Sequence, residues 1–293
     1  MPKYGISTGC PLLTESVTDR RRQLDEIKAV GAQYVRVDLG TGDTDQFDAV
    51  LADAKVRGLQ VMAILFGTTG YVSPSDAYTF AEAQASRLAS NVTMFEFCNE
   101  PQSNGWNGTA YGGSLIGAHN GLKAGNPNAI MIAGALGSPV SGVPQFVLDM
   151  YAAGAKGHFD VLSLHLYDDP DTRGDWNMWD WAFYTSPCVR SIMDSNGDSA
   201  IPIISTETGL PSVDPGTGLP DADYNETKQA TVCGHDFDHI GTGLTSDLGS
   251  TASMCWYNMV DDNPPAGVCD GLLHSDYSKK PAWYIYQSRA QSQ

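Results

Sequence analysis

The chain has 293 residues, of which 34 are acidic and 17 are basic, so its formal net charge is −17. A chain this acidic, without a dense cluster of lysine and arginine, lacks the basic surface that nucleic-acid binding requires. Hydrophobic residues make up 42% of the chain and charged residues 17%, which predicts a globular body rather than a disordered chain.

Two kinds of segment alternate along the chain. Short apolar or β-branched runs are followed by longer stretches in which apolar residues recur at helical spacing. The predicted strands are Tyr4–Ser7, Tyr34–Asp38, Gln60–Leu65, Thr93–Phe97, Ala129–Ala133, Val161–His165, Pro202–Thr206 and Ala252–Tyr257. The predicted helices are Arg20–Val30, Gln46–Arg57, Ala77–Ala89, Leu115–Ala124, Pro144–Ala153, Trp179–Asp194, Asn225–Ile240 and Pro281–Arg289.

Eight strands that each precede a helix predict a closed (β/α)8 barrel, the TIM barrel of the α/β class, over one domain of residues 1–293. An open doubly wound sheet is the alternative, but the first strand-helix turn, Ser7 to Pro11, lacks a glycine-rich phosphate loop. We therefore expect no nucleotide cofactor. The acidic runs Asp168 to Asp171 and Asp261-Asp262 lack the spacing of a calcium loop, so we expect no metal.

The sequence also limits where the protein acts. No apolar run reaches the roughly 18 residues of a membrane span, and no signal peptide precedes Tyr4. We expect a monomer that acts outside the membrane, and the sequence favours secretion after loss of a leader, or release by lysis. Cys98 and Cys255 are expected as buried thiols, while one or two disulfides among Cys188, Cys233, Cys255 and Cys269 stay open.

A glutamate stands at the end of two distant predicted strands. Glu100 follows the fourth strand in Asn99-Glu100-Pro101, and Glu207 follows the seventh in Thr206 to Gly209. The carboxyl ends of barrel strands meet at one mouth, so two carboxyl groups would face each other there. Glycoside hydrolysis requires such a pair, one protonated and one ionised. The alternative is that each glutamate caps a helix or pairs with an arginine such as Arg36.

These motifs resemble the retaining glycoside hydrolases of clan A, and the resemblance covers nearly the whole chain. It rests on the two glutamate motifs together with Arg36, His165, Tyr167, Trp256 and the tail from Gly271 to Tyr284. The resemblance does not resolve the family. Ser205 to Pro211 is similar to plant-type β-1,3-glucanases, whereas the Asn-Glu-Pro triplet and the tail are similar to cellulases, xylosidases and exopolysaccharide hydrolases.

The resemblance implies roles for individual residues. Glu100 would be the general acid/base and Glu207 the nucleophile, with Asn99 bound to the neighbouring sugar hydroxyl. Arg36 and Tyr167 would hold Glu207 ionised and oriented, and His165 would lie beside the acid/base or the substrate. Asp38 and Asp261 are weaker candidates for binding sugar hydroxyls.

Aromatic side chains at the mouth would bind the apolar faces of sugar rings. Trp256, at the end of the eighth predicted strand, is the leading candidate for this platform. Further candidates are Trp106 and Tyr71, and Trp176 and Trp179 in the aromatic loop after the sixth strand. Several such sites in a row favour an endo-acting enzyme on a polysaccharide or oligosaccharide.

Two other functions compete with this hypothesis. A carbohydrate-binding barrel without activity would keep the aromatic platforms but would normally lose one glutamate, and both are present. An aldolase would need a lysine at a strand end, whereas Lys55, Lys123 and Lys156 fall in predicted helices or loops.

Overall fold

The computed structural model describes residues 3–9, 11–137, 140–167, 180–241, 253–261 and 269–292. Eight parallel strands pair in chain order, and β1 pairs with both β2 and β8, which closes the sheet into a barrel. The strands are β1 (Tyr4–Gly9), β2 (Tyr34–Leu39), β3 (Gln60–Leu65), β4 (Met94–Phe97), β5 (Ile130–Leu136), β6 (Val161–His165), β7 (Ile203–Thr208) and β8 (Met254–Tyr257). The predicted (β/α)8 barrel is therefore confirmed.

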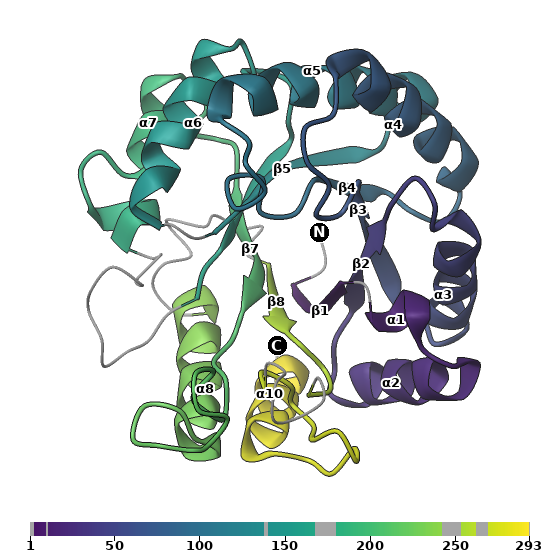
Figure 1. The fold of residues 1–293 in the computed structure, drawn as a ribbon, viewed down its shortest axis with the longest axis vertical. Helices are drawn as coiled ribbons and strands as arrows, with labels where there is room; N and C mark the ends of the chain where they lie inside the picture. The colour runs from purple at the N-terminus through teal and green to yellow at the C-terminus, as the bar shows by residue number, and fades with distance from the viewer. Residues whose placement is uncertain are drawn as a thin grey trace.

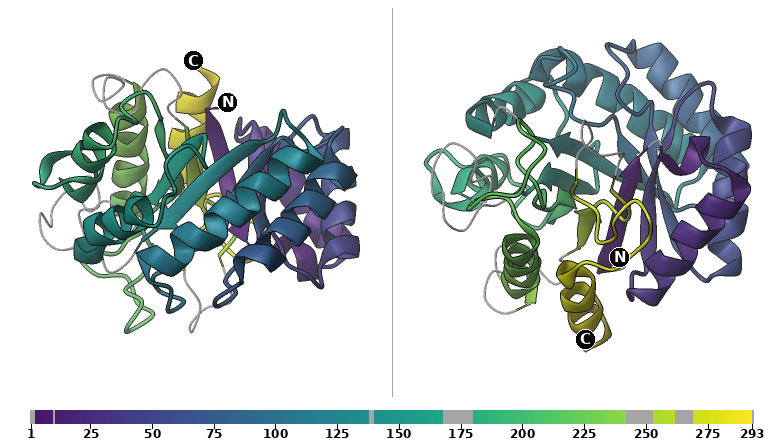
Figure 2. Two further views of the ribbon diagram at one scale, coloured as in Figure 1. Left: turned by 90° about the horizontal axis from the view of Figure 1, so that it is seen from above. Right: turned by 60° about the horizontal axis from the view of Figure 1, so that its bottom comes forward.

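The helices surround the strands (Figure 1). They are α1 (Pro11–Thr14), α2 (Val17–Ala29), α3 (Thr44–Val56), α4 (Pro74–Leu88), α5 (Gly108–Gly125), α6 (Val143–Ala152), α7 (Val189–Ser195), α8 (Glu226–Gly241) and α10 (Pro281–Gln291), with a 3-10 turn η1 (Val140–Gly142) and a π-helical turn η2 (Asp180–Tyr184). Figure 2 shows α10 beside β1, and the Tyr286 hydroxyl of α10 donates to the carbonyl of Gly5 at 2.9 Å. None of the described helices has the length and apolar character needed to cross a membrane.

Polar side chains fix where several helices begin. Ser16 accepts a hydrogen bond from the amide of Asp19 at the start of α2, and Ser73 accepts one from Asp76 at the start of α4. Such caps satisfy amide groups that have no partner within the helix. Because β-to-α loops end at these caps, the capped helix starts help to fix the loops at the barrel mouth.

Two predicted helices differ from the structure. The prediction of one helix over Trp179–Asp194 is wrong, because the segment forms η2 and then α7, separated by Pro187, which cannot continue a helix. Helix α5 begins at Gly108, seven residues earlier than predicted. Glycine disfavours helix, but a Cβ at Gly117 or Gly121 would lie 2.1 Å from a carbonyl oxygen of α4, so close packing requires these glycines.

The barrel interior has an apolar floor. Alternate residues of a strand point to opposite faces of the sheet, and the inward residues near the amino ends of the strands form one buried cluster. Gly5 contributes no side chain to the floor, because a Cβ there would lie 2.5 Å from the Tyr34 ring. The floor consists of Tyr34, Met62, Met94, Ile132, Val161, Ile204 and Cys255. The polar residues described below stand above it, toward the carboxyl ends of the strands.

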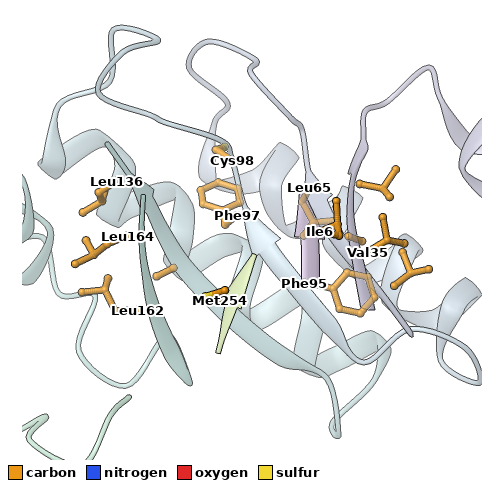
Figure 3. Close-up of a cluster of buried hydrophobic side chains, with 14 of the residues drawn as sticks. Ile6, Val35, Leu65, Phe95, Phe97, Cys98, Leu136, Leu162, Leu164 and Met254 are labelled. Carbon is orange, nitrogen blue, oxygen red and sulfur yellow. The ribbon is translucent and has the colours of Figure 1, made fainter. Parts of the chain in front are cut away.

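The outward faces of the strands pack against the helices in a larger apolar core. The strand sequences are nearly continuous apolar runs because both faces of a parallel barrel sheet are buried. Figure 3 shows part of it, with labels on Ile6, Val35, Leu65, Phe95, Phe97, Cys98, Leu136, Leu162, Leu164 and Met254.

Candidate active site

Glu100 and Glu207 meet at the carboxyl end of the barrel. One carboxylate oxygen of each and a ring nitrogen of His165 all lie within 4.8 Å of one another. The Glu100 side chain is 30% exposed and the Glu207 side chain 12% exposed, so both are largely withdrawn from water. The structure thus brings together the two carboxyl groups that the sequence places 107 residues apart.

His165, from the end of β6, lies between the two carboxylates. Its Nδ1 is 2.9 Å from Oε1 of Glu100 and 3.4 Å from Oε2 of Glu207, and its side chain is fully buried. Burial by itself raises the pKa of Glu100, but the hydrogen bond and charge of His165 and the charge of Arg36 outweigh it, so this pKa lies below its usual value. His165 therefore acts on both carboxyl groups.

Arg36, on β2, is fully buried and donates to four groups. Its Nη1 donates to Glu207 at 2.6 Å and to Ser7 at 2.9 Å, and its Nη2 donates to Oδ1 of Asn99 at 2.7 Å. Its Nε donates to Glu96 at 2.5 Å. Burial disfavours the cation, but the charges of Glu96 and Glu207 more than compensate and raise the pKa of Arg36 above its usual value. The guanidinium therefore stays charged.

Tyr167 holds the other oxygen of Glu207. Its hydroxyl donates to Oε2 at 3.0 Å, while Ser7 Oγ lies 3.4 Å from Oε1. Burial and the neighbouring Glu207 charge raise the pKa of Tyr167 well above 10, so the phenol keeps its proton. Both oxygens of Glu207 thus accept hydrogen bonds from neighbouring side chains, which fixes the orientation of the carboxylate.

The turn that carries Glu100 has an unusual backbone. Cys98 and Glu100 have φ angles of 61° and 42°, in the left-handed region that non-glycine residues rarely adopt. Neighbouring strands hold the turn, since the amide of Asn99 donates to Gly67 O at 2.8 Å and that of Glu100 donates to Ala135 O at 3.1 Å. The chain after β4 is therefore bent so that Glu100 reaches the mouth.

The structure contradicts the expectation that Trp256 is a sugar platform. Trp256 is fully buried in the layer between sheet and helices, and its Nε1 donates to Asp270 O at 2.9 Å. Cys255 lies in the barrel interior, so the alternation of side chains along β8 directs Tyr257 inward as well. Tyr257 is partly exposed and pairs in register with Ser7 of β1, beside the carboxylates.

The structure describes two of the four other aromatic residues that were predicted to bind sugar rings. Trp106 is 6% exposed, and its Nε1 donates to Thr69 O at 3.2 Å, so it packs beneath its loop instead of facing solvent. Tyr71 lies on Trp106 with a ring-centroid distance of 5.3 Å and is 64% exposed. Trp176 and Trp179 lie outside the described residues, so their predicted role stays a prediction.

The structure also describes Asp38 and Asp261, which were weaker candidates for binding sugar hydroxyls, and the cysteines that could form disulfides. Asp38 is buried on β2, on the same inward face as Arg36. Asp261 is held by the buried Lys280 at 2.7 Å. Within the described part of the chain, no disulfide joins the four cysteines left open by the sequence, since Cys188, Cys233 and Cys255 are all free thiols, and so is Cys98.

Glu96 was not among the residues predicted from the sequence to lie in the site. This residue lies on β4 with no exposed surface, and it accepts hydrogen bonds from Arg36 and from the hydroxyls of Ser163 and Thr206. A glutamate between Phe95 and Phe97 in an apolar strand was the available signal, because a buried carboxylate requires a partner.

Glu100, His165 and Glu207 are also the residues among those described that would suit a metal ion by distance. The Arg36 cation already binds Glu207, and a metal would have to share this carboxylate with it. The geometry therefore fits acid–base chemistry on a neutral ligand better than cation binding.

Comparisons with known proteins bear on the fold. No protein-family model matches the chain, and no curated protein matches it. Among solved structures, the chain is similar to a family 39 glycoside hydrolase from the gut symbiont Bacteroides cellulosilyticus, with a TM-score of 0.72 and 19% identity over 98% of this chain and 63% of that one.

Two further neighbours are also carbohydrate-active enzymes. A GH5_18 protein from Streptomyces cattleya, in complex with Manβ1-4GlcNAc, has a TM-score of 0.69 and 15% identity over 99% of this chain and 80% of that one. An FMN-binding β-glucuronidase from Facaelibacterium prausnitzii has a TM-score of 0.66 and 20% identity, covering 99% of this chain and 44% of that one. The chain thus spans less than two thirds of two of these three neighbours, and it has the barrel fold that these glycoside hydrolases share.

Proposed function

We propose that this protein is a retaining β-glycoside hydrolase, with Glu100 as general acid/base and Glu207 as nucleophile. The observation that carries the proposal is that one carboxylate oxygen of Glu100 lies within 4.8 Å of one carboxylate oxygen of Glu207. Retaining enzymes hold their carboxyl groups about 5 to 5.5 Å apart, whereas inverting enzymes need about 6.5 to 9.5 Å for a water molecule between them.

In the first step, Glu207 attacks the anomeric carbon while Glu100 gives its proton to the glycosidic oxygen, so the glycosidic bond breaks and a glycosyl ester forms. In the second step, Glu100 takes a proton from water, whose oxygen attacks the same carbon and displaces Glu207. Two inversions at one carbon restore the original configuration.

The neighbouring groups support these roles. Arg36 and Tyr167 orient Glu207, and Arg36 occupies Oδ1 of Asn99, which leaves the Asn99 amide to donate to a sugar hydroxyl. The pKa of Glu100 lies below its usual value. A sugar bound over the mouth would cover the exposed part of this side chain and raise its pKa toward that of a general acid.

The substrate side of the proposal rests on aromatic residues. Tyr257 is directed into the barrel beside Ser7, which contacts Glu207, and it replaces Trp256 as the candidate for the ring beneath the reacting sugar. Tyr71, exposed on the loop after β3 and supported by Trp106, is a candidate contact for a neighbouring sugar unit, which supports action within a polysaccharide or oligosaccharide.

The test is hydrolysis of chromogenic β-glycosides and dyed polysaccharides by the wild type, with the anomer of the first product read by NMR. Glu100→Gln and Glu207→Gln should each abolish turnover while the protein stays folded, whereas Glu82→Gln on helix α4 should remain active. With an activated aryl glycoside, azide should rescue Glu207→Ala and give the α-glycosyl azide, and it should give the β-glycosyl azide with Glu100→Ala.

Two outcomes would contradict the proposal. Release of a first product with inverted configuration would exclude the double displacement. Tight binding of a polysaccharide without turnover by the wild type would instead identify a carbohydrate-binding barrel, the competing function.

A further inference from the structure

A second buried carboxylate lies beneath the proposed catalytic pair. Glu96 and Arg36 are both completely buried inside the barrel, and Nε of Arg36 is 2.5 Å from Oε2 of Glu96. The mechanism proposed above assigns no role to Glu96. Burial of a charge is costly unless it is paired and hydrogen-bonded, so a carboxylate at this position must be compensated by its contacts.

Those contacts come from three other strands. Arg36 on β2 contacts Oε2, while Ser163 on β6 and Thr206 on β7 both donate to Oε1. The Thr206 bond is 2.8 Å long. Glu96 is therefore fixed across the barrel and has little freedom to rotate.

Arg36 connects Glu96 to the residues at the mouth of the barrel. A guanidinium is a planar fork, so fixing Nε fixes the direction of both terminal nitrogens. One of them binds Glu207 at 2.6 Å and the other binds Asn99 at 2.7 Å. The proposed nucleophile and the proposed hydroxyl-binding amide are thus oriented by the same guanidinium, which Glu96 holds from below.

The charges of Glu96, Arg36 and Glu207 also indicate that Glu96 influences the proposed catalytic pair. Arg36 carries one positive charge between the two carboxylates Glu96 and Glu207. Without Glu96, the whole charge of Arg36 would act on Glu207 and Glu100. A more positive potential would make both carboxylates weaker bases.

We propose that Glu96 is a positioning residue for glycoside hydrolysis: through Arg36 it orients Glu207 and Asn99, and its charge offsets part of the Arg36 charge that acts on the catalytic pair. This inference rests on the proposed function and deepens it. Glu96 does not touch the substrate, because it has no exposed surface.

The groups around this network come from several strands. Glu96 interacts electrostatically with Cys98, Tyr111 and Cys255 in addition to Arg36. Burial raises the pKa of each of these thiols and of this phenol, so they stay neutral around pH 7. Among the described residues, the groups that contact the catalytic pair itself include Arg36, His165, Tyr167, Ser7 and Ser103.

The principal variant is Glu96→Gln, which keeps the shape and removes the charge. We expect kcat to fall about 10- to 100-fold with KM changed less than threefold, because the displaced groups act mainly in the transition state. Both limbs of the pH profile of kcat/KM should move to lower pH by about one unit. Asp53→Asn is the matched control, since Asp53 pairs with buried Arg20 outside the barrel, and it should lower stability without moving either limb.

A second variant covers the case in which Glu96→Gln does not fold. Thr206→Val removes one of the donors to Glu96 but keeps its charge, so kcat should fall while the limbs stay in place. Unchanged limbs in Glu96→Gln, or a kcat within threefold of the wild type in Thr206→Val, would overturn the proposal.

A measurement independent of turnover separates this inference from the proposed function. Carboxyl ¹³C NMR, with Glu100 assigned by comparison with Glu100→Gln, should show Glu100 titrating at lower pH in Glu96→Gln than in the wild type. An equal midpoint would refute the electrostatic effect of Glu96. A wild type that titrates as expected but hydrolyses no glycoside would instead refute the proposed function.

Discussion

Replacement of Arg36 by lysine tests the centre of the site. Arg36 donates to Glu207 at 2.6 Å and to Asn99 at 2.7 Å through different nitrogens, while its Nε binds Glu96. The single ammonium group of a lysine keeps the charge but cannot reach all three groups. Arg36→Lys therefore isolates the contribution of the fork from that of the charge.

The expected magnitude follows from the hydrogen bonds that a lysine at this position cannot make. Each hydrogen bond to a charged group is worth about 1.5 to 3 kcal/mol, so the absence of two such bonds in the transition state corresponds to about 3 to 6 kcal/mol. At 1.36 kcal/mol for each factor of ten, kcat/KM should fall about 10²- to 10⁴-fold. The assay is steady-state hydrolysis of the best aryl glycoside, normalised to the folded fraction from circular dichroism.

The matched control is Arg20→Lys. Arg20 is 8% exposed and donates through Nε and Nη2 to Asp53 at 2.9 and 2.8 Å, away from the barrel mouth. It should lose stability but keep its kcat/KM. If Arg36→Lys stays within threefold of the wild type in kcat/KM, the guanidinium does not orient the catalytic groups and the reasoning is wrong.

Three further predictions concern the surroundings. His165→Phe removes the contact that lowers the pKa of Glu100, so this pKa should rise and the basic limb of kcat/KM should move to higher pH; a shift to lower pH would contradict the assignment. Tyr257→Ala should lower kcat/KM about tenfold, as expected for loss of a ring that contacts the sugar, while Tyr257→Phe should stay within threefold in the same assay. Lys280→Met leaves Asp261 buried without its cation and should lower the unfolding free energy by about 3 to 5 kcal/mol in urea denaturation, and a change below about 1 kcal/mol would count against this role.

The sequence was sufficient for the barrel and for the convergence of several site residues. Alternating strand and helix patterns located all eight strands, because the period of the apolar residues reports directly on burial. The parallel topology then brings Glu100 and Glu207 to one end. The neighbours Arg36, His165 and Tyr167 also lie where the resemblance implied, in contact with these carboxylates.

The choice between Trp256 and Tyr257 shows where the sequence was insufficient. Both faces of a barrel strand are buried, so Met254 to Tyr257 carries no polar alternation that would reveal which residues point inward. A shift of one residue exchanges the two faces. Only the packing of Cys255 against the barrel floor settles the direction of its neighbours.

Glu96 was missed for a related reason. Its significance depends on Arg36, Ser163 and Thr206, which come from three other strands and are close only after the barrel has closed. The split of the predicted helix Trp179–Asp194 has a local cause, since Pro187 overrode the apolar spacing around it. Local rules can find such breaks, whereas buried polar networks require the register of the whole sheet.

The left-handed turn after β4 would make the proposed activity a late property of the folded chain. Cys98 and Glu100 adopt backbone angles that cost about 1 to 2 kcal/mol each, and bonds to Gly67 and Ala135 outside β4 hold the turn in place. A partly assembled barrel that lacks the neighbouring strands would relax this bend and direct Glu100 elsewhere. A nascent chain or a truncated fragment would therefore contain every group of the proposed catalytic site without the geometry that the proposed reaction requires.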